Sequence, residues 1–462
     1  MFETIHDIMN WVGGNTTMYL LPFLAVIGVL VFVHEWGHYI VARLCGVRVE
    51  TFSIGFGKKI WSRTDKSGCE WRVSLIPLGG YVKMFGDTDP ASSTHTEVVT
   101  EGDGHMRAMT DAERGQAFFS KPVWKRAAIV FAGPGINYLF AILVLAAVFA
   151  TVGRPVTPPI AAAVIVGSAA DEAGFKPHDR IVAIDGKPVR RFADIQRQVA
   201  VSLNTPLNIT VERDGKDMTL EHVTPHLDSV SDRFGFLHQR GLLGIIGPGI
   251  GIDAASVEAV DGQDGSDIAA LLRAHMNDAP VTLRMAAMGD LPPQSIRVLL
   301  DPAINQDFLD GKKEAQGIQL APRMETETAT YGIAGAAVEA LNETWFVTTG
   351  TLQSLWQMVI GTRSAQELGG IIRIGAVTGD AAQAGWIAIL MLGALLSINL
   401  GLINLMPIPM LDGGHLLFYA IEAISGRPVP ERMQDAALRF GFVLLIALMV
   451  FANLNDLIQL AK

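Results

Sequence analysis

The chain has 462 residues, of which 50% are hydrophobic and 18% charged, and its formal net charge is −10. It is too apolar for a wholly soluble protein and too mixed for a pure bundle of spanning helices, so we expect membrane spans together with soluble domains. The acidic balance excludes a general basic field for nucleic acid. Two cysteines without a C-x-x-C pair indicate neither a cysteine zinc site nor a disulfide framework.

The first predicted element is a span from about Met18 to Cys45, an apolar run long enough to cross a bilayer with some tilt. The residues before it contain no Lys or Arg but do contain Glu3 and Asp7, which is the wrong charge for a cleavable signal peptide. We therefore expect the run to be kept as a transmembrane helix.

Inside this run lies the sequence H-E-x-x-H, formed by His34, Glu35 and His38. One helical turn separates the two histidines, so both imidazoles face the same side and can bind one metal ion. Glu35 can serve as the general base for the attacking water. A chance match would leave three ionisable side chains in hydrocarbon without a reason. The motif therefore predicts a metal site within the membrane.

The flanking charges predict the orientation. Arg43 and Arg48 follow the first span, and Lys121, Lys125 and Arg126 precede the second. By the positive-inside rule, the segment between the spans is cytoplasmic and the N-terminus lies outside. The motif ends five residues before Arg43, roughly 7–8 Å of helix. The metal site is therefore expected nearer the cytoplasmic face.

Residues 47–84 have the β-branched and aromatic composition of strands, with Gly55-Phe56-Gly57 and Pro77-Leu78-Gly79-Gly80-Tyr81 as glycine-rich turns. This composition predicts a β-hairpin. Residues 86–116 change to Asp, Glu, Thr, Ser and Gly with few large apolar side chains, which predicts a flexible cytoplasmic insertion.

A second span is expected over about 127–152. Gly133-Pro134-Gly135 and Asn137 interrupt its apolar run. Small residues allow helices to approach closely, and an asparagine can hydrogen-bond across a helix interface. Asn137 fits a contact between helices and a role at the metal site equally well.

Residues 154–325 form a large outer block with two weakly similar pieces, at 181–186 and 257–262. The first follows Gly167-Ser168-Ala169-Ala170 and Ala173-Gly174-Phe175, a pattern that resembles a PDZ domain, a module that binds peptide ends by strand addition. The second piece resembles a degenerate PDZ domain.

Residues 331–360 are amphipathic, and their Glu and Gln side chains exclude a comfortable span. A helix along the outer membrane surface and a helix packed against other domains both fit.

A third span is expected from about Trp386 into Asn404. Pro407 and Pro409 then break the helix. Unpaired backbone at membrane depth is tolerated only where protein or a wet cavity satisfies it, so this broken segment, which carries Asp412, is suited to form the wall of a cavity. A fourth span over about 436–451 puts both termini outside.

The third metal ligand must come from another element, because catalytic zinc has three protein ligands and one open position. Asp412 is the acid of the broken segment, and His415 lies three residues further along. We favour Asp412, with His415 as the competing ligand or as a buried hydrogen-bonding group.

These motifs together resemble the site-2 protease family of intramembrane zinc metalloproteases. The likeness is carried by His34-Glu35-Trp36-Gly37-His38, Pro77-Leu78-Gly79-Gly80-Tyr81, the outer PDZ-like block and Asn404-Leu405-Met406-Pro407-Ile408-Pro409-Met410-Leu411-Asp412-Gly413. The resemblance implies one Zn²⁺ held by His34, His38 and Asp412, with Glu35 as the base. It implies substrate-handling roles at Asn399, Asn404, Pro407 and Pro409, and in the reentrant strands around Gly55 and Gly79.

The implied substrates are single-pass membrane proteins, trimmed beforehand by another protease, such as an anti-sigma factor after a first cut or signal-peptide remnants. The PDZ-like block either binds a peptide or excludes substrates that have not been trimmed. The implied location is the bacterial inner membrane, with both termini and the PDZ-like block on the periplasmic side. No nucleic acid is expected.

We therefore expect an α-helical polytopic membrane protein with four transmembrane helices, a membrane-reentrant β-element and an inserted extracytoplasmic α+β block of PDZ type. The expected units are 1–46, 47–126, 127–153, 154–228, 229–325, 326–384, 385–420 and 421–462. Two alternatives remain: a catalytically inactive scaffold that presents PDZ domains, which the intact Glu35 disfavours, and a transporter, which the lack of inverted repeats disfavours.

Overall fold

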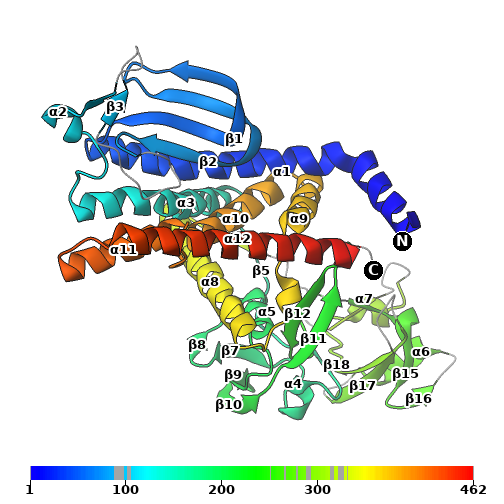
Figure 1. Cartoon of the computed structure of the whole chain (residues 1–462). Coiled ribbons are helices and arrows are strands. Elements are labelled where there is room, and N and C mark those ends of the chain that lie inside the picture. Colours follow the sequence, from blue (N-terminus) through cyan, green and yellow to red (C-terminus); the bar gives the residue numbers. More distant parts are fainter. Residues whose placement is uncertain are drawn as a thin grey trace.

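A computed structural model of the whole chain gives the architecture in Figure 1. It describes residues 2–87, 98–100, 106–249, 251–264, 267–276, 279–287, 293–312, 317–320, 327–329 and 331–460. Statements about contacts below apply to these residues.

Among the described residues, four helices are long and apolar enough to cross a membrane, which matches the number of spans expected. They are α1 (Phe2–Leu44, apolar from Met18), α3 (Val123–Thr151), α10 (Trp386–Leu405) and α12 (Glu431–Leu460). The fourth is longer at both ends than the predicted 436–451. Helix α3 continues through Pro134, so the interruption in its apolar run does not break the helix. The first turn of α1 and the last turn of α12 lie at the same end of the bundle (Figure 1).

A long antiparallel hairpin lies along α1 (Figure 1). Its strands are β1 (Val49–Thr64) and β2 (Glu70–Met84), as expected for 47–84. Phe52 stacks on Trp71 at a ring-centroid distance of 4.4 Å, and Tyr39 of α1 packs edge-on against both rings. Gly55 has a φ of +84°, and an added Cβ there would lie 2.5 Å from the carbonyl oxygen of Ile76. Glycine is therefore required where β1 bends.

The predicted flexible insertion contains short elements in its described part. These are β3 (Val98–Thr100), paired with β4 (Met106–Ala108), and α2 (Asp111–Arg114). Thr110 and Glu113 form a capping box, and Arg107 pairs with Glu113 at 2.7 Å. Residues 106–114 therefore contain a strand and a capped helical turn, local structure that the polar composition did not predict. Residues 88–97 and 101–105 of the insertion lie outside the described residues.

The described part of the outer block contains two larger sheets, each with its own hydrophobic cluster, in addition to two-stranded pairs. The first has the order β10-β9-β7-β8 and is covered by α4 (Ala169–Glu172) and α5 (Phe192–Ala200). The second has the order β13-β6-β18-β17-β15-β16 and is accompanied by α6 (Ile268–Ala274). Strand β6, which precedes the first sheet in the chain, pairs with β18, so the first segment contributes one strand to the second sheet.

The remaining bounds of the outer block are these: β5 (Arg154–Val156), β6 (Ala163–Ile165), β7 (Arg180–Ile184), β8 (Lys187–Pro188), β9 (Leu207–Arg213), β10 (Lys216–Val223), β11 (His226–Ser231), β12 (Leu237–Leu242), β13 (Ile245–Ile246), β14 (Gly251–Asp253), η1 (Ala254–Ser256), β15 (Val257–Val260), β16 (Gln263–Asp264), β17 (Pro280–Met285), β18 (Gln294–Leu299), α7 (Gln306–Leu309), β19 (Gly317–Gln319) and β20 (Glu327–Ala329).

Helix α8 (Ile333–Val359) packs on the spans and on the outer block. Ala336 and Ala340 join a buried cluster with residues of α3 and α10. Glu339 and Glu343 are buried but paired: Arg154 reaches them at 3.0 and 2.6 Å. Packing against other parts of the protein, one of the two arrangements expected for residues 331–360, is present, while the exposed Trp345 and Trp356 also fit the other arrangement, a helix along the membrane surface. Buried carboxylates are tolerated here because each has an arginine partner.

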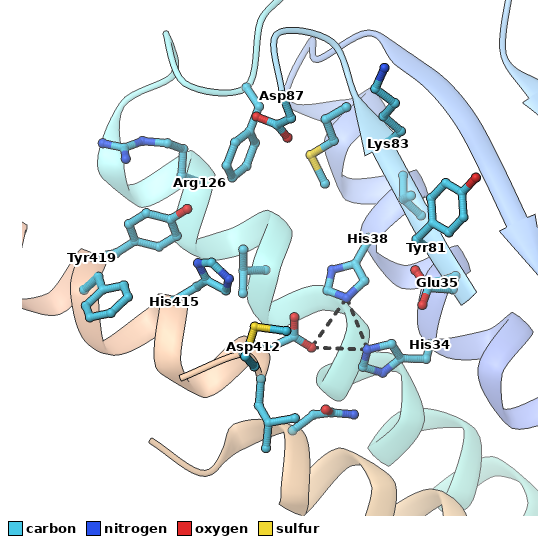
Figure 2. A pocket seen from close by; sticks show the side chains of 18 of the residues that line it. His34, Glu35, His38, Tyr81, Lys83, Asp87, Arg126, Asp412, His415 and Tyr419 are labelled. Carbon is cyan, nitrogen blue, oxygen red and sulfur yellow. Dashed lines mark hydrogen bonds and ion pairs between the residues drawn. The ribbon is translucent and has the colours of Figure 1, made fainter. Parts of the chain in front are cut away.

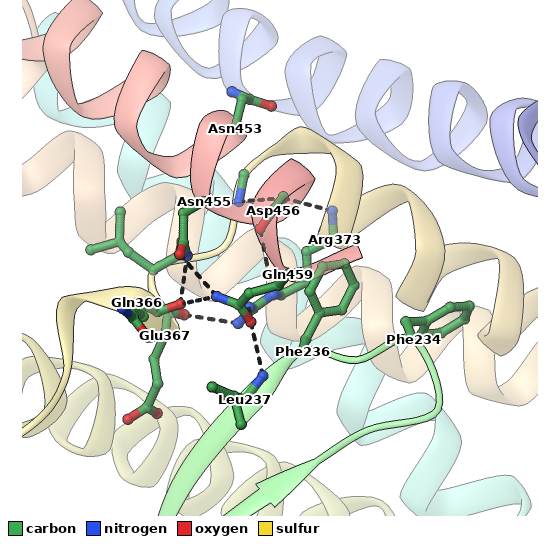
Figure 3. Close-up of polar contacts among 12 residues, drawn as sticks. Phe234, Phe236, Leu237, Gln366, Glu367, Arg373, Asn453, Asn455, Asp456 and Gln459 are labelled. Carbon is green, nitrogen blue, oxygen red and sulfur yellow. Dashed lines mark hydrogen bonds and ion pairs between the residues drawn. The ribbon is translucent and has the colours of Figure 1, made fainter. Parts of the chain in front are cut away.

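A polar network connects the end of α12 with α9 (Ile371–Ala384), which follows η2 (Ala365–Glu367), and with the turn before β12 (Figure 3). The fully buried Asp456 accepts from the backbone N–H groups of Gly370 and Arg373 at 2.8 and 2.9 Å. Gln459 accepts from the N–H of Leu237 at 2.9 Å. The outer block is thereby tied to the ends of the spanning helices.

Candidate metal centre

The two histidines of the H-E-x-x-H motif lie on one face of α1, as helical periodicity requires. Their ring centroids are 4.9 Å apart, and the Nε2 atoms of His34 and His38 lie 3.3 Å from each other. Both nitrogens point into the protein, toward a third group from the far end of the chain (Figure 2).

The third group is Asp412, the first residue of α11 (Asp412–Ser425). Helix α10 stops at Leu405, and the turn that follows includes Met410 with a φ of +81°. An added Cβ on Gly414 would lie 2.5 Å from the carbonyl oxygen of Ile408, so only glycine fits this tight approach. The turn brings Asp412 Oδ2 to 3.2 Å from His34 Nε2 and 3.5 Å from His38 Nε2.

This arrangement fits a zinc ion. Zinc–ligand bonds of about 2.0–2.1 Å in tetrahedral geometry separate the ligand atoms by about 3.3–3.4 Å. The three measured separations are close to this value. Asp412 Oδ2 is buried and, among the described residues, has no partner with hydrogen-bond geometry. In the described part of the chain, these three residues are the one group of three or more His, Cys, Asp or Glu side chains whose ligand atoms all lie within 4.8 Å of one another, close enough to hold a metal ion.

Helix α3 supports both histidines from behind. His38 Nδ1 donates to the backbone carbonyl of Ile129 at 2.9 Å, and the Asn137 side chain lies 3.0 Å from His34 Nδ1. An added Cβ on Gly133 would overlap the His38 ring and approach the His34 ring at 2.9 Å. The glycine therefore allows the two imidazoles to lie directly on α3.

Glu35 is buried beside the cluster and faces the same cavity (Figure 2). Strand β2 approaches it closely: an added Cβ on Gly80 would lie 2.9 Å from Glu35 Cγ and 2.7 Å from the carbonyl oxygen of Ser53. The hairpin and the metal ligands thus form opposite walls of one space, with a carboxylate between them that can accept a proton.

The cavity has a volume of about 1300 Å³. The metal cluster lies on one wall of the cavity, and residues of β2, α3, α11 and the segment before α12 line the rest. One wall is fixed by Arg126 of α3, which pairs with Glu422 of α11 at 2.6 Å and lies over the Tyr419 ring at 4.9 Å. The helix that carries Asp412 is therefore attached to the helix that supports the histidines.

The predicted substrate-handling residues separate into two sets. Asn404 and Gly79 line the cavity. Asn399 instead accepts from the Thr351 hydroxyl of α8 at 3.0 Å. Pro409 packs against Gly441 of α12, and Gly55 lies at the bend in β1. Pro407 lies in the turn after α10, and it does not line the cavity.

His415, the competing third ligand, lines the cavity one turn from Asp412 but does not join the converging cluster. Its ring packs edge-on against Phe418. The geometry therefore favours Asp412.

Sequence reasoning missed Ile129 and Gly80. A backbone carbonyl carries no side-chain signal, so Ile129 could not have been found. The doubled glycine at 79–80 was a usable signal for close approach, but it was assigned to a turn.

Comparison with known proteins gives a consistent result. The model of peptidase family M50 matches residues 22–448. A protein of Agrobacterium fabrum named "Putative zinc metalloprotease" is 38% identical over 447 residues, which covers 97% of each chain. The "Regulator of sigma E protease" of Haemophilus influenzae is 33% identical over 459 residues, which covers 95% of this chain and 98% of the relative.

Proposed function

Since this chain belongs to peptidase family M50 and is a membrane zinc metalloprotease, we propose that it is an intramembrane endopeptidase that cleaves single-pass membrane proteins within or near their span. The observation that carries the proposal is the convergence of His34, His38 and Asp412 on spanning or broken helices, beside a buried glutamate. Burying such ionisable side chains inside a membrane costs free energy, which indicates that they are there for a function.

In this proposal His34, His38 and Asp412 hold the zinc ion. When bound, zinc supplies an electrophile that makes water more acidic and stabilises charge on the scissile carbonyl oxygen. Glu35 takes the proton from the attacking water and later gives it to the leaving amine. Glu35 suits this role because it is buried beside the three proposed ligands and faces the same cavity.

The hairpin receives the substrate as an extended segment. A helical peptide bond is hydrogen-bonded and shielded, so the substrate helix must unwind before it can be cut. Gly79 and Gly80 line the cavity, and the lack of a side chain at Gly80 lets β2 pass directly beside Glu35, so a substrate segment paired with β2 would lie next to the base. Asn404 is the asparagine suited to bind the substrate backbone from the opposite wall. Asn399, Pro407, Pro409 and Gly55 then shape the site without lining it.

The outer block controls which substrates reach the metal centre. We assign its two sheets to PDZ-type units, near 154–228 and 229–325, that either bind a peptide end or exclude substrates with a large outer domain. Substrates are then membrane proteins already trimmed by another protease, an anti-sigma factor among them, or signal-peptide remnants. The relative named regulator of sigma E protease supports this class. The bacterial relatives support the inner membrane as the location, and the flanking charges support an orientation with both termini and the outer block in the periplasm.

The test is cleavage of a purified single-pass substrate in proteoliposomes, by wild type and by Glu35→Gln. We expect both proteins to bind one zinc ion and only the wild type to cleave. Equal cleavage by both, or none by a zinc-loaded wild type, would contradict the proposal and favour an inactive scaffold or a transporter.

A further inference from the structure

Asn137 is fully buried on α3, and its side chain faces the metal cluster. The amide nitrogen lies 3.0 Å from His34 Nδ1. The amide oxygen Oδ1 is buried and has no hydrogen-bond partner among the described residues. An unpaired buried oxygen is costly, so this side chain is kept for a reason beyond filling space.

The contact between helices at this position does not use the side chain. Ser397 of α10 donates from its hydroxyl to the backbone carbonyl oxygen of Asn137 at 2.9 Å, and both residues are fully buried. Any residue at 137 would offer that carbonyl. The helix contact therefore explains the serine and leaves the amide of Asn137 without a structural partner other than His34.

The metal site places a specific demand on His34. Its Nε2 points at Asp412 and His38, so Nε2 must offer its lone pair to a bound ion. A neutral imidazole with a free Nε2 carries its hydrogen on Nδ1. For His38 the carbonyl of Ile129 sets this tautomer, because a carbonyl can only accept. For His34 the group in reach of Nδ1 is the Asn137 amide.

An amide offers a donor at one end and an acceptor at the other, and half a turn about its terminal bond exchanges them. This rotation of the Asn137 amide brings the unpaired Oδ1 to His34 Nδ1. There Oδ1 accepts the Nδ1 hydrogen that the metal-binding tautomer carries. Partners of this kind orient a ligating histidine, and their loss typically weakens metal binding about 10- to 100-fold.

We propose that Asn137 is a positioning residue of the metal centre, which accepts the Nδ1–H of His34 and so selects the tautomer whose Nε2 binds zinc. This inference rests on the proposed role of His34 as a ligand. It assigns the side chain to the site and the backbone of the same residue to the helix contact.

The test compares Asn137→Leu and Asn137→Asp, with zinc affinity measured by competition with a chelator in the full-length protein. Leucine has a similar volume but cannot accept a hydrogen bond, so zinc affinity should fall about 10- to 100-fold. Aspartate can accept from Nδ1–H, so affinity should stay at or above that of the wild type. A residue that only packs between helices gives the opposite ranking, because a buried apolar side chain is tolerated and a buried carboxylate is not.

Ser397→Ala is the matched control, since it removes the helix contact and leaves the amide. It should keep wild-type zinc affinity. Wild-type affinity in Asn137→Leu, or a loss in Asn137→Asp as large as in Asn137→Leu, overturns the inference. His34→Ala separates this failure from that of the ligand assignment, because unchanged zinc affinity in His34→Ala would refute the assignment itself.

A second measurement needs no variant. Magic-angle-spinning NMR of the zinc-loaded wild type with ¹⁵N-labelled histidine should find hydrogen on Nδ1 of His34. Hydrogen on Nε2 instead would refute the inference.

Discussion

Asp412 Oδ2 and His34 Nε2 lie 3.2 Å apart, although one residue begins α11 and the other lies in α1. The two helices meet on α3, which supports His34 through Asn137 and holds α11 through the ion pair between Arg126 and Glu422. The central helix of the site therefore contributes none of the three proposed ligands. It sets the distance between side chains that come from distant parts of the chain.

The first prediction concerns the third ligand. Asp412→Asn should bind zinc at least 100-fold more weakly, because a neutral amide replaces a charged ligand. His415→Ala should keep zinc affinity within a few-fold, since its ring lies outside the converging cluster. Zinc content after dialysis against a chelator measures both. The assignment is wrong if Asp412→Asn retains its zinc while His415→Ala loses it.

The second prediction concerns the support of the histidines. Gly133→Val should weaken zinc binding, because its side chain would occupy the space of the His38 and His34 rings. Overpacking of this kind typically costs about 1–3 kcal/mol. Gly28→Ala of α1 is the control, since an added Cβ there meets no atom within 4 Å. The chelator-competition assay should find a loss in Gly133→Val alone, and equal affinities would show that α3 does not constrain the ligands.

The third prediction concerns Glu343, where α8 meets the outer block. Burial raises the pKa of its carboxyl, but Arg197 and Arg154 lower it by more, so the pKa lies below its ordinary value. As the pH falls, the Glu343 carboxyl is protonated in the unfolded chain first, at about pH 4.3, and in the folded protein only at lower pH. The ionised carboxylate therefore stabilises the fold above about pH 4.3, and this stabilisation is lost as the pH falls below that value.

Glu343→Gln should therefore destabilise the protein at pH 7 by about 1–3 kcal/mol, because Arg197 loses its charged partner and Arg154 keeps only Glu339. The variant should also lose part of the acid dependence of its melting temperature. Glu172→Gln, which alters an exposed carboxylate, should change neither property. Identical acid dependence in Glu343→Gln and wild type would contradict this account of the contact.

Much of the site could be predicted from local sequence. Helical periodicity put His34 and His38 on one face, and the prolines at 407 and 409 marked the break that presents Asp412. Length and hydropathy were sufficient for the four spans, because a bilayer demands a continuous apolar run.

The remainder depends on tertiary contacts that no local pattern encodes. Glu339 and Glu343 excluded a comfortable span by composition, yet α8 packs on α3 and α10 because arginines from distant segments pair with both carboxylates. Strand β6 joins the sheet formed mainly by a later part of the chain, which a division by sequence order could not anticipate. The partner of His38 was hidden for a similar reason, since Ile129 contributes only its backbone, whereas the side chain of Asn137, beside His34, was open to prediction.

The most direct test of the central claim is the mass of the products. A single-pass substrate in proteoliposomes, with helix-weakening residues in its span, should be cut by the wild type at a peptide bond inside the span, on its cytoplasmic half. Mass spectrometry of both fragments locates that bond, and Glu35→Gln should give no such fragments. A cut found only outside the span, or the same fragments from Glu35→Gln, would contradict intramembrane cleavage by this centre.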